Sequence, residues 1–176
     1  MSSQLRVDKI LPVDGAPTSG GGGIIQIVSA TKTDRQLFNS SSYTDVTGMS
    51  VSITPKFSSS KMFIMINVHV GGDQASYHAY RVLRDSTVVT QGTHATGSRT
   101  NVSFGGRIDQ DYDNYMMSFN FLDSPSTTSA TTYKLQVSDA YDPSNRNIVI
   151  NGTGDDANDS YTLCGTSTIS VMEVSA

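Results

Sequence analysis

The sequence predicts an all-β protein, a jelly-roll β-sandwich of about eight antiparallel strands that follows an extended N-terminal arm. One observation is composition, because 36% of the 176 residues are hydrophobic and 16% are charged, against about 45–50% and 25% in average soluble domains. A second is that serine and threonine form about a quarter of the chain, and these residues suit strands and turns better than helices. The third is that apolar residues recur at alternate positions in many short stretches, whereas no long stretch shows a helical period.

The glycine run Gly20–Gly23 marks a boundary near the start of the chain. Such a run has almost no conformational preference and would be costly inside a core strand, so it indicates a hinge. The segment before it carries apolar residues at Leu5, Val7 and Ile10 and is interrupted by prolines. We therefore expect an arm with its hinge over residues 1–23 and a single domain over residues 24–176.

From residue 24 onward, β-type stretches alternate with turn residues. The stretch from Met62 to Val70 has five apolar residues on one face and mixed residues on the other, which predicts a central strand covered on both sides. Arg84-Asp85-Ser86 lies between two stretches and predicts a hairpin loop. The predicted strands are Ile24–Thr31, Tyr43–Ile53, Met62–Val70, Tyr77–Leu83, Val88–Thr90, Tyr115–Leu122, Thr132–Val137, Ile148–Ile150 and Thr168–Val174.

Short strands separated by turns indicate two sheets that bury their inner faces against each other, as in a jelly roll. An immunoglobulin-type sandwich is the competing architecture. Its usual pair of cysteines around a tryptophan is impossible here, because the chain has one cysteine and no tryptophan. Many sandwiches lack that pattern, so both architectures stay open.

Charge and hydropathy exclude several classes of function. The net charge is −4, and the lysines and arginines are scattered singly, whereas binding to nucleic acid needs clustered basic residues. No stretch approaches the roughly 18 consecutive apolar residues of a membrane span. The N-terminus lacks the basic and apolar regions of a signal peptide. We therefore expect no nucleic-acid partner, no membrane span and no secretion signal of its own.

Several segments resemble one group of proteins. Ser3–Ile10, followed by Gly15-Ala16-Pro17, resembles a short motif common in tail-fibre-like virion proteins of phages that infect marine bacteria, cyanobacteria especially. Gly23–Val28 and Ser167–Val174 look like the first and last strands of the C-terminal domains of that group. The resemblance covers nearly the whole chain, although between Ala75 and Gln110 only the rhythm of strands and turns matches.

The resemblance implies a non-enzymatic bacteriophage structural protein on the virion surface, assembled in the host cytoplasm, with a trimeric jelly-roll head. Leu5, Val7 and Ile10 would then attach the arm to other virion proteins. Because the arm is too short to form a shaft, we expect a short surface appendage of the tail-fibre or receptor-binding type. A capsid decoration or knob protein is the alternative, and a glycan-cleaving enzyme, which needs two positioned carboxylates, is a third hypothesis.

The first and last strands of the head are candidates for a homotrimer interface, because they are apolar and a closed trimer covers edge strands that would otherwise aggregate. The residues we expect there are Ile25, Ile27, Ile169 and Val171.

Tyrosines at or beside predicted loops are candidates for contact with a host surface glycan or protein. Tyrosine offers apolar area and a hydroxyl while losing little rotamer entropy. Packing at the edge of the core is the alternative explanation. The candidate residues are Tyr77, Tyr80, Tyr112 and Tyr141.

Two acidic stretches are weak candidates for a cation site. In the first, aspartates alternate as in the first half of a calcium-binding EF-hand loop, but the glutamate that would close the set is missing. Solvated acidic loops are the alternative explanation for both stretches. The candidate ligands are Asp109, Asp111, Asp113, Asp155 and Asp156.

The remaining chemically active side chains carry no recognisable signature. His69, His78 and His94 could mark a metal or trimer-axis ion site, with ordinary polar or interface roles as the alternative. Cys164 lies in the strand-like stretch Tyr161–Val174, so we expect a buried apolar thiol. No catalytic residue and no cofactor are predicted.

Overall fold

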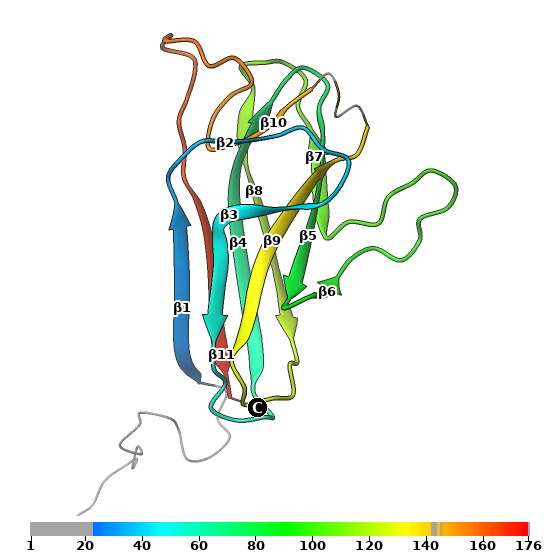
Figure 1. The fold of residues 1–176 in the computed structure, drawn as a ribbon. Coiled ribbons are helices and arrows are strands. Elements are labelled where there is room, and N and C mark those ends of the chain that lie inside the picture. The colour runs from blue at the N-terminus through cyan, green and yellow to red at the C-terminus, as the bar shows by residue number, and fades with distance from the viewer. Residues whose placement is uncertain (1–22, 142–143, 145, 176) are drawn as a thin grey trace, which may run out of the picture.

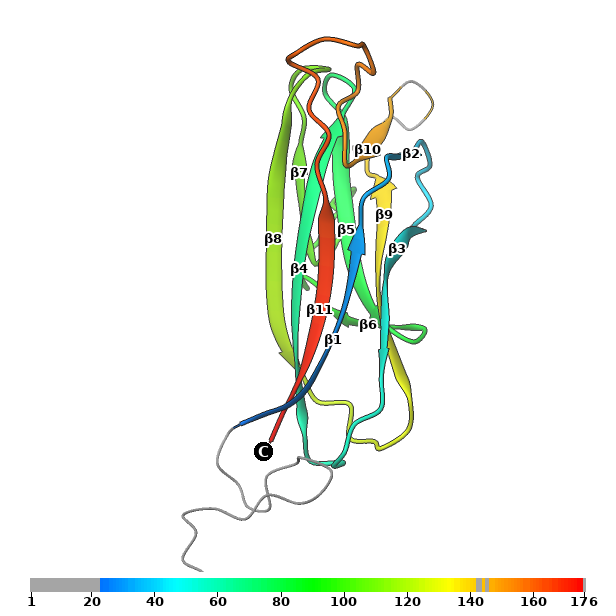
Figure 2. The same cartoon turned by 90° about the vertical axis from the view of Figure 1, so that its left-hand side faces the viewer.

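The computed structural model describes residues 23–141, 144 and 146–175. Leu5, Val7, Ile10 and the predicted arm before residue 23 lie outside the described residues. The described part is all-β, with strands in two antiparallel sheets that face each other (Figures 1 and 2). The strands are β1 (Ile24–Lys32), β2 (Gln36–Phe38), β3 (Thr44–Ile53), β4 (Lys61–Gly72), β5 (Tyr77–Arg84), β6 (Thr87–Thr90), β7 (Phe104–Arg107), β8 (Asn114–Asp123), β9 (Thr131–Asp139), β10 (Ile148–Ile150) and β11 (Ser167–Val174).

The strand order is that of a jelly roll. In the first sheet, sheet A, β1, β11, β4 and β8 lie side by side, and β10 and β2 continue the sheet at the far end of β4. In sheet B the order is β3, β9, β5, and both β6 and β7 pair with the free edge of β5. The chain therefore alternates between the two sheets, as the double Greek key of a jelly roll requires. This order confirms the predicted fold class.

Every strand predicted from the sequence is confirmed, with bounds that differ by at most two residues. β4 is central as expected, because it pairs with β11 and β10 on one side and with β8 on the other. The expected hairpin loop joins β5 to β6. Two short strands were missed, β2 and β7, and of the strand-like stretch Tyr161–Val174 only the part from Ser167 onward is a strand.

The core lies between the sheets and follows the alternation of each strand. In β4, Met62, Ile64 and Ile66 point inward with at most 1% of their surface exposed. Tyr133 and Leu135 of β9 cover them from sheet B without any exposed surface. Each fully buried side chain of this size contributes about 1.5–3 kcal/mol relative to an exposed one, so burial of this interior is a large stabilising contribution to the sandwich.

One half-buried polar contact ties the two sheets together. The Arg84 guanidinium on β5 forms an ion pair of 2.7 Å with Asp123 on β8, and the Tyr133 hydroxyl on β9 donates a 2.6 Å hydrogen bond to the same carboxylate. Desolvation by burial, together with this hydrogen bond, raises the pKa of Tyr133 well above its ordinary value. Asp123 on sheet A is therefore bound by side chains from two strands of sheet B, β5 and β9.

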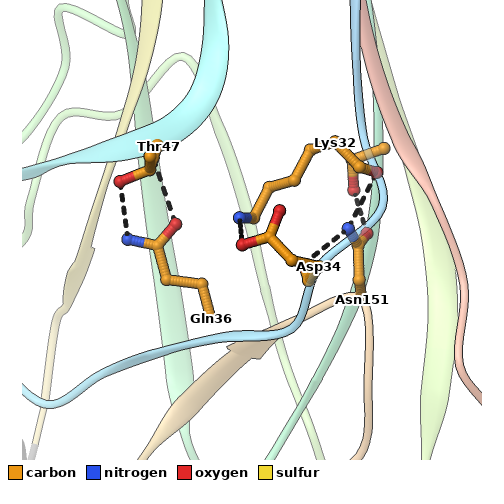
Figure 3. A network of polar contacts seen from close by, with 6 residues as sticks. Lys32, Asp34, Gln36, Thr47 and Asn151 are labelled. Atoms are coloured by element: carbon orange, nitrogen blue, oxygen red, sulfur yellow. Dashed lines mark hydrogen bonds and ion pairs between the residues drawn. The ribbon is translucent and has the colours of Figure 1, made fainter.

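A second polar network fixes the ends of four strands, and Asn151 is its centre (Figure 3). The Asn151 amide donates to the carbonyl oxygens of Lys32 and Asp34 at 2.9 and 3.1 Å. Its oxygen accepts a 2.6 Å hydrogen bond from Ser167, whose hydroxyl oxygen accepts from the backbone N–H of His69. The network therefore joins β1, β4 and β11 just after β10.

The predicted interface residues divide between the core and the surface. Ile169 and Val171 have no exposed surface, because they point into the sandwich from β11. Ile27 on β1 is 55% exposed, and Ile25 is half-buried beside the irregular pairing at the start of that strand. Ile169 and Val171 therefore pack within their own chain and cannot contribute side chains to an interface between copies.

Within the described part of the chain, no helix has the length and apolar character needed to cross a bilayer.

Candidate functional site

The loops of the sandwich gather at two opposite ends (Figures 1 and 2). Gly23 and Ser175 lie together at one end, where the Ser175 N–H donates a 3.0 Å hydrogen bond to the Gly23 carbonyl. We call this the terminus end. At the other end, the loop end, lie the connections that follow β1, β2, β4, β7, β9 and β10. Three of the predicted tyrosines, Tyr77, Tyr112 and Tyr141, and both acidic stretches belong to loop-end connections or to the strand ends beside them.

Two tyrosines and two arginines form an exposed patch at the loop end. The rings of Tyr77 and Tyr141 lie 5.3 Å apart between centroids. Arg107 lies 5.5 Å from the Tyr77 ring centroid, and Arg146 lies 5.6 Å from that of Tyr141. Both distances are within the reach of cation–π attraction, which is about 6 Å. Tyr141 is nevertheless 69% exposed, so the patch offers aromatic area to the surroundings.

A second aromatic pair lies beside the acidic loops. The rings of Tyr112 and Tyr161 meet nearly edge to face, 6.2 Å apart, and both are 53% exposed. Together with Asp155 they line a pocket of about 380 Å³. The Tyr161 hydroxyl donates a 2.8 Å hydrogen bond to Asp159, and this bond raises the pKa of Tyr161. Tyr161 was not predicted as a contact residue, because the sequence placed it in a strand.

The two acidic stretches meet across a more polar pocket of about 580 Å³. The Asp155 N–H donates a 2.9 Å hydrogen bond to the carbonyl of Asp111, and the Gln74 N–H donates to the Asp111 carboxylate. The glycine at position 154 lets the second acidic stretch approach this closely, because a Cβ there would collide with the backbone of Gly72. The pocket is lined by Asp73, Gln74, Asp111, Arg146, Gly154 and Asp155.

The remaining candidate cation ligands have other partners. Asp109 forms an ion pair with Arg107, and Asp156 forms one of 3.3 Å with Arg35. Asp113 accepts a 3.1 Å hydrogen bond from the backbone of Gln110. Within the part of the chain that the structure describes, no three histidine, cysteine, aspartate or glutamate side chains lie close enough together to hold a metal ion.

Tyr80 does not belong to the loop end, and its predicted contact role is wrong. It points into the core from β5 with no exposed surface, and its ring stacks on Phe104 at 4.7 Å between centroids. The prediction failed because the sequence does not reveal on which face of β5 a tyrosine lies when polar and apolar residues are mixed there.

Two of the histidines, His78 and His69, and the cysteine lie in three different environments. His78 is buried in β5, and burial lowers its pKa to about 3, so the imidazole is neutral. His69 Nε2 lies 3.0 Å from the Asn114 side-chain oxygen on sheet A. Cys164 is exposed, so the predicted burial is wrong, because the strand expected around it begins three residues later.

The connection between β6 and β7 forms a separate polar projection from the side of sheet B (Figure 1). It is closed by hydrogen bonds of its own, from the Gly92 N–H to the Val102 carbonyl at 3.0 Å and from the Ala95 N–H to the Asn101 side chain at 3.1 Å. His94 and Arg99 line a small pocket of about 340 Å³ within it. The projection is therefore a unit with hydrogen bonds of its own, and its Ser98 and Arg99 line a second pocket, of about 660 Å³, together with Tyr77 and Arg107 of the loop end.

No protein-family model and no curated protein matches the sequence. Among solved structures, the chain is similar to a structure of infectious bursal disease virus Gt strain and to one of the Gx strain. The sequence identity is 13% in both comparisons, and the TM-scores are 0.45 and 0.43. Each alignment covers 99% of this chain and 44% of the viral chain. The chain therefore spans less than half the length of these structures.

Proposed function

We propose that the chain is a non-enzymatic structural module of a bacteriophage particle, a short homotrimeric surface appendage that is anchored by its N-terminal arm and presents its loop end to the host. The observation that carries this proposal is the separation of the two ends. Residue 23, where the arm joins the head, lies at the terminus end, and the exposed tyrosines lie at the loop end. An anchored head with this polarity holds its recognition residues away from the particle.

The assignment to a virion is supported by the resemblance of Ser3–Ile10 and Ser167–Val174 to tail-fibre-like proteins. Jelly rolls are common in viral capsid and lectin domains, which agrees with that resemblance. Fold alone does not identify function, so the argument depends on the two ends and on the arm.

The geometry does not favour the glycan-cleaving hypothesis. A glycosidase needs a general acid whose pKa is raised, commonly by an apolar and water-excluding pocket. Asp111 and Asp155 are instead exposed at an open and polar surface. We therefore interpret the carboxylates of this pocket as groups for hydrogen bonding.

Anchoring is tested by comparing the full chain with a chain that lacks residues 1–22, both supplied with the same C-terminal tag during infection. We expect the full chain to be incorporated and the shortened chain to be lost from purified particles, as measured by quantitative mass spectrometry. Equal incorporation of both chains, or the absence of both from particles, would contradict the proposal.

Recognition is tested on particles that carry Tyr112→Ser or Tyr141→Ser. We expect unchanged incorporation and slower adsorption to host cells, because each substitution removes exposed aromatic area at the loop end. Phe57→Ser is the matched control, since Phe57 is 42% exposed in the β3–β4 connection at the terminus end. Unchanged adsorption of both tyrosine variants, with reduced heat stability of particles that lack the protein, would favour the decoration hypothesis instead.

A further inference from the structure

The strand register builds a row of apolar side chains across the outward face of sheet A. Ile27 on β1 pairs with Met172 on β11, Met172 pairs with Phe63 on β4, and Phe63 pairs with Leu122 on β8. The outer members, Ile27 and Leu122, are 55% and 57% exposed, and the two inner members are half-buried. We call these four side chains the apolar row.

The next positions along the strands extend this surface without adding charge. Met65 is 37% exposed beside the apolar row, and its neighbours on the adjoining strands are Ser170 and Asn120. Met116 is 50% exposed farther along β8. Beside the apolar row in the direction of the loop end, these outward residues are therefore methionine, serine and asparagine.

Charged residues on these four strands almost all point inward. Lys32 and Glu173 are buried, and Asp123 is held by Arg84 from sheet B. Lys61, at the start of β4, lies on the same face as the apolar row, and its ammonium donates a 2.7 Å hydrogen bond to Ser124. The centre of the outward face is therefore neutral.

The outward face of sheet B has the opposite character. Lys134 forms an ion pair of 2.8 Å with Asp45, and Arg81 donates a 2.7 Å hydrogen bond to Gln136. Arg81 also lies 4.1 Å from the ring centroid of Tyr43. Sheet B thus has the charged surface expected next to water, and the apolar character of sheet A is specific to that sheet.

We propose that the outward face of sheet A, centred on the apolar row, is the surface on which a second copy of this chain docks. Four strands about 4.8 Å apart and ten residues at about 3.4 Å each give about 600 Å² of flat area. Corrugation by side chains increases this area, so it approaches the roughly 800 Å² that each partner buries in a standard interface. Interface cores are likewise depleted of charge and enriched in methionine and aromatic residues.

Charge indicates a second copy rather than a basic or acidic partner. The chain carries a net charge of −4, so two copies repel each other wherever their acidic surfaces meet. The centre of the sheet A face is free of that repulsion. Its serine and asparagine side chains both donate and accept hydrogen bonds, so they can pair with neutral polar side chains of another copy.

Cyclic symmetry would then place the terminus ends of all copies on the same side of the assembly. The apolar row lies near that end, two positions from the start of β4. This docking surface deepens the proposed function and depends on it only for the number of copies, which we expect to be three.

The test is the molar mass of the full chain at micromolar concentration, measured by light scattering after size exclusion. We expect a multiple of 18.8 kDa for the unchanged chain and 18.8 kDa for Ile27→Asp and Leu122→Asp. A charge buried without a partner at an interface should raise the dissociation constant by at least about 100-fold. Because both side chains are more than half exposed in the single chain, the variants should keep the circular dichroism of the unchanged chain.

Leu163→Asp is the matched control, because Leu163 is 55% exposed at the loop end and lies outside the face. Asn120→Arg provides a second variant that keeps every apolar side chain, and we expect it to dissociate the assembly as well. A monomeric unchanged chain would overturn both the docking surface and the proposed trimer. A multimer that survives all three face variants, or that Leu163→Asp also dissociates, would overturn the docking surface and leave self-association intact.

Discussion

The imidazole of His78 lies inside the sandwich, 3.0 Å from the Ser76 hydroxyl and 3.3 Å from that of Tyr80. Desolvation by burial lowers its pKa from 6.5 to about 3. The unfolded chain therefore takes up a proton on this residue before the folded chain does. The contribution of His78 to stability is complete above pH 6.5 and is lost as the pH falls toward 3.

We expect acid to destabilise the protein through this residue at pH values where most carboxylates are still ionised. Each pH unit below the unfolded pKa costs about 1.4 kcal/mol, so the loss at pH 4.5 is about 2–3 kcal/mol. This loss of stability is measured by urea unfolding of the unchanged chain and of His78→Gln at pH 7.5 and 4.5. The variant should lose less stability than the unchanged chain between the two pH values. His94→Gln, at an exposed position, is the control, and equal losses in all three proteins would contradict the assignment.

The carboxylates with shifted pKa values become protonated, and lose their contribution to stability, at lower pH than His78. Hydrogen bonds from Lys32 and Lys134 hold the pKa of Asp34 and Asp45 below the ordinary 3.8. Stability from these pairs is present above that value and is lost only as the pH falls further. The loss of stability from protonating Asp34 and Asp45 therefore occurs at lower pH than the loss from protonating His78.

At the scale of the elements, Asn151 holds together strands that are distant in sequence. Its backbone has a φ of +66°, which asparagine tolerates better than most residues, and its side chain makes hydrogen bonds on both of its polar atoms. Loss of this side chain would leave the carbonyl of Lys32 and the hydroxyl of Ser167 without these partners. A buried polar group without a partner costs about 1–3 kcal/mol.

We therefore expect Asn151→Ala to lower the free energy of unfolding by about 3 kcal/mol, measured by urea titration. Asn158→Ala, at an exposed asparagine in the following loop, should change it by less than about 0.5 kcal/mol. Equal stabilities of the two variants would show that the network does not hold these strands.

The sequence was sufficient to predict the long elements of the fold. Alternation of apolar and polar residues reveals a strand in the sequence when one face of the strand is buried. This is the case in β4, where five inward residues have at most 1% exposure. Alternation fails for β2, which has three residues, and for β7, in which Gly105 and Gly106 carry no side chain to alternate. β2 and β7 are therefore strands only because they pair with neighbouring strands in the folded protein.

The candidate site was predictable only in part, because it depends on contacts between loops. The sequence identified Tyr77, Tyr112 and Tyr141 as exposed aromatic residues, but not the two arginines beside them. It also identified both acidic stretches, but not their meeting through Asp111 and Asp155. The inward direction of Ile169 and Val171 follows from the register of β11 with β4, which composition does not encode.

At the scale of the whole molecule, docking through the sheet A face would couple folding to protein concentration. A partner that binds only the folded chain stabilises it by mass action. We expect the Tm of the unchanged chain to rise between micromolar and hundred-micromolar concentrations, as measured by calorimetry. The Tm of Ile27→Asp should be independent of concentration, and equal behaviour of the two proteins would contradict the coupling.

The projection between β6 and β7 gives the molecule a practical use as a scaffold for displayed peptides. Its base is fastened by Ser103, whose N–H donates to the Tyr80 carbonyl at 2.8 Å and whose side chain also bonds Thr90. Its tip contains only one backbone hydrogen bond that the structure describes, from Arg99 to Thr96 at 3.4 Å. Doubling the length of a flexible loop costs only about 0.6 kcal/mol. An epitope inserted at Gly97-Ser98 would therefore stand out from the side of the sandwich, away from the anchoring end and next to the pocket that Ser98 shares with Tyr77 and Arg107.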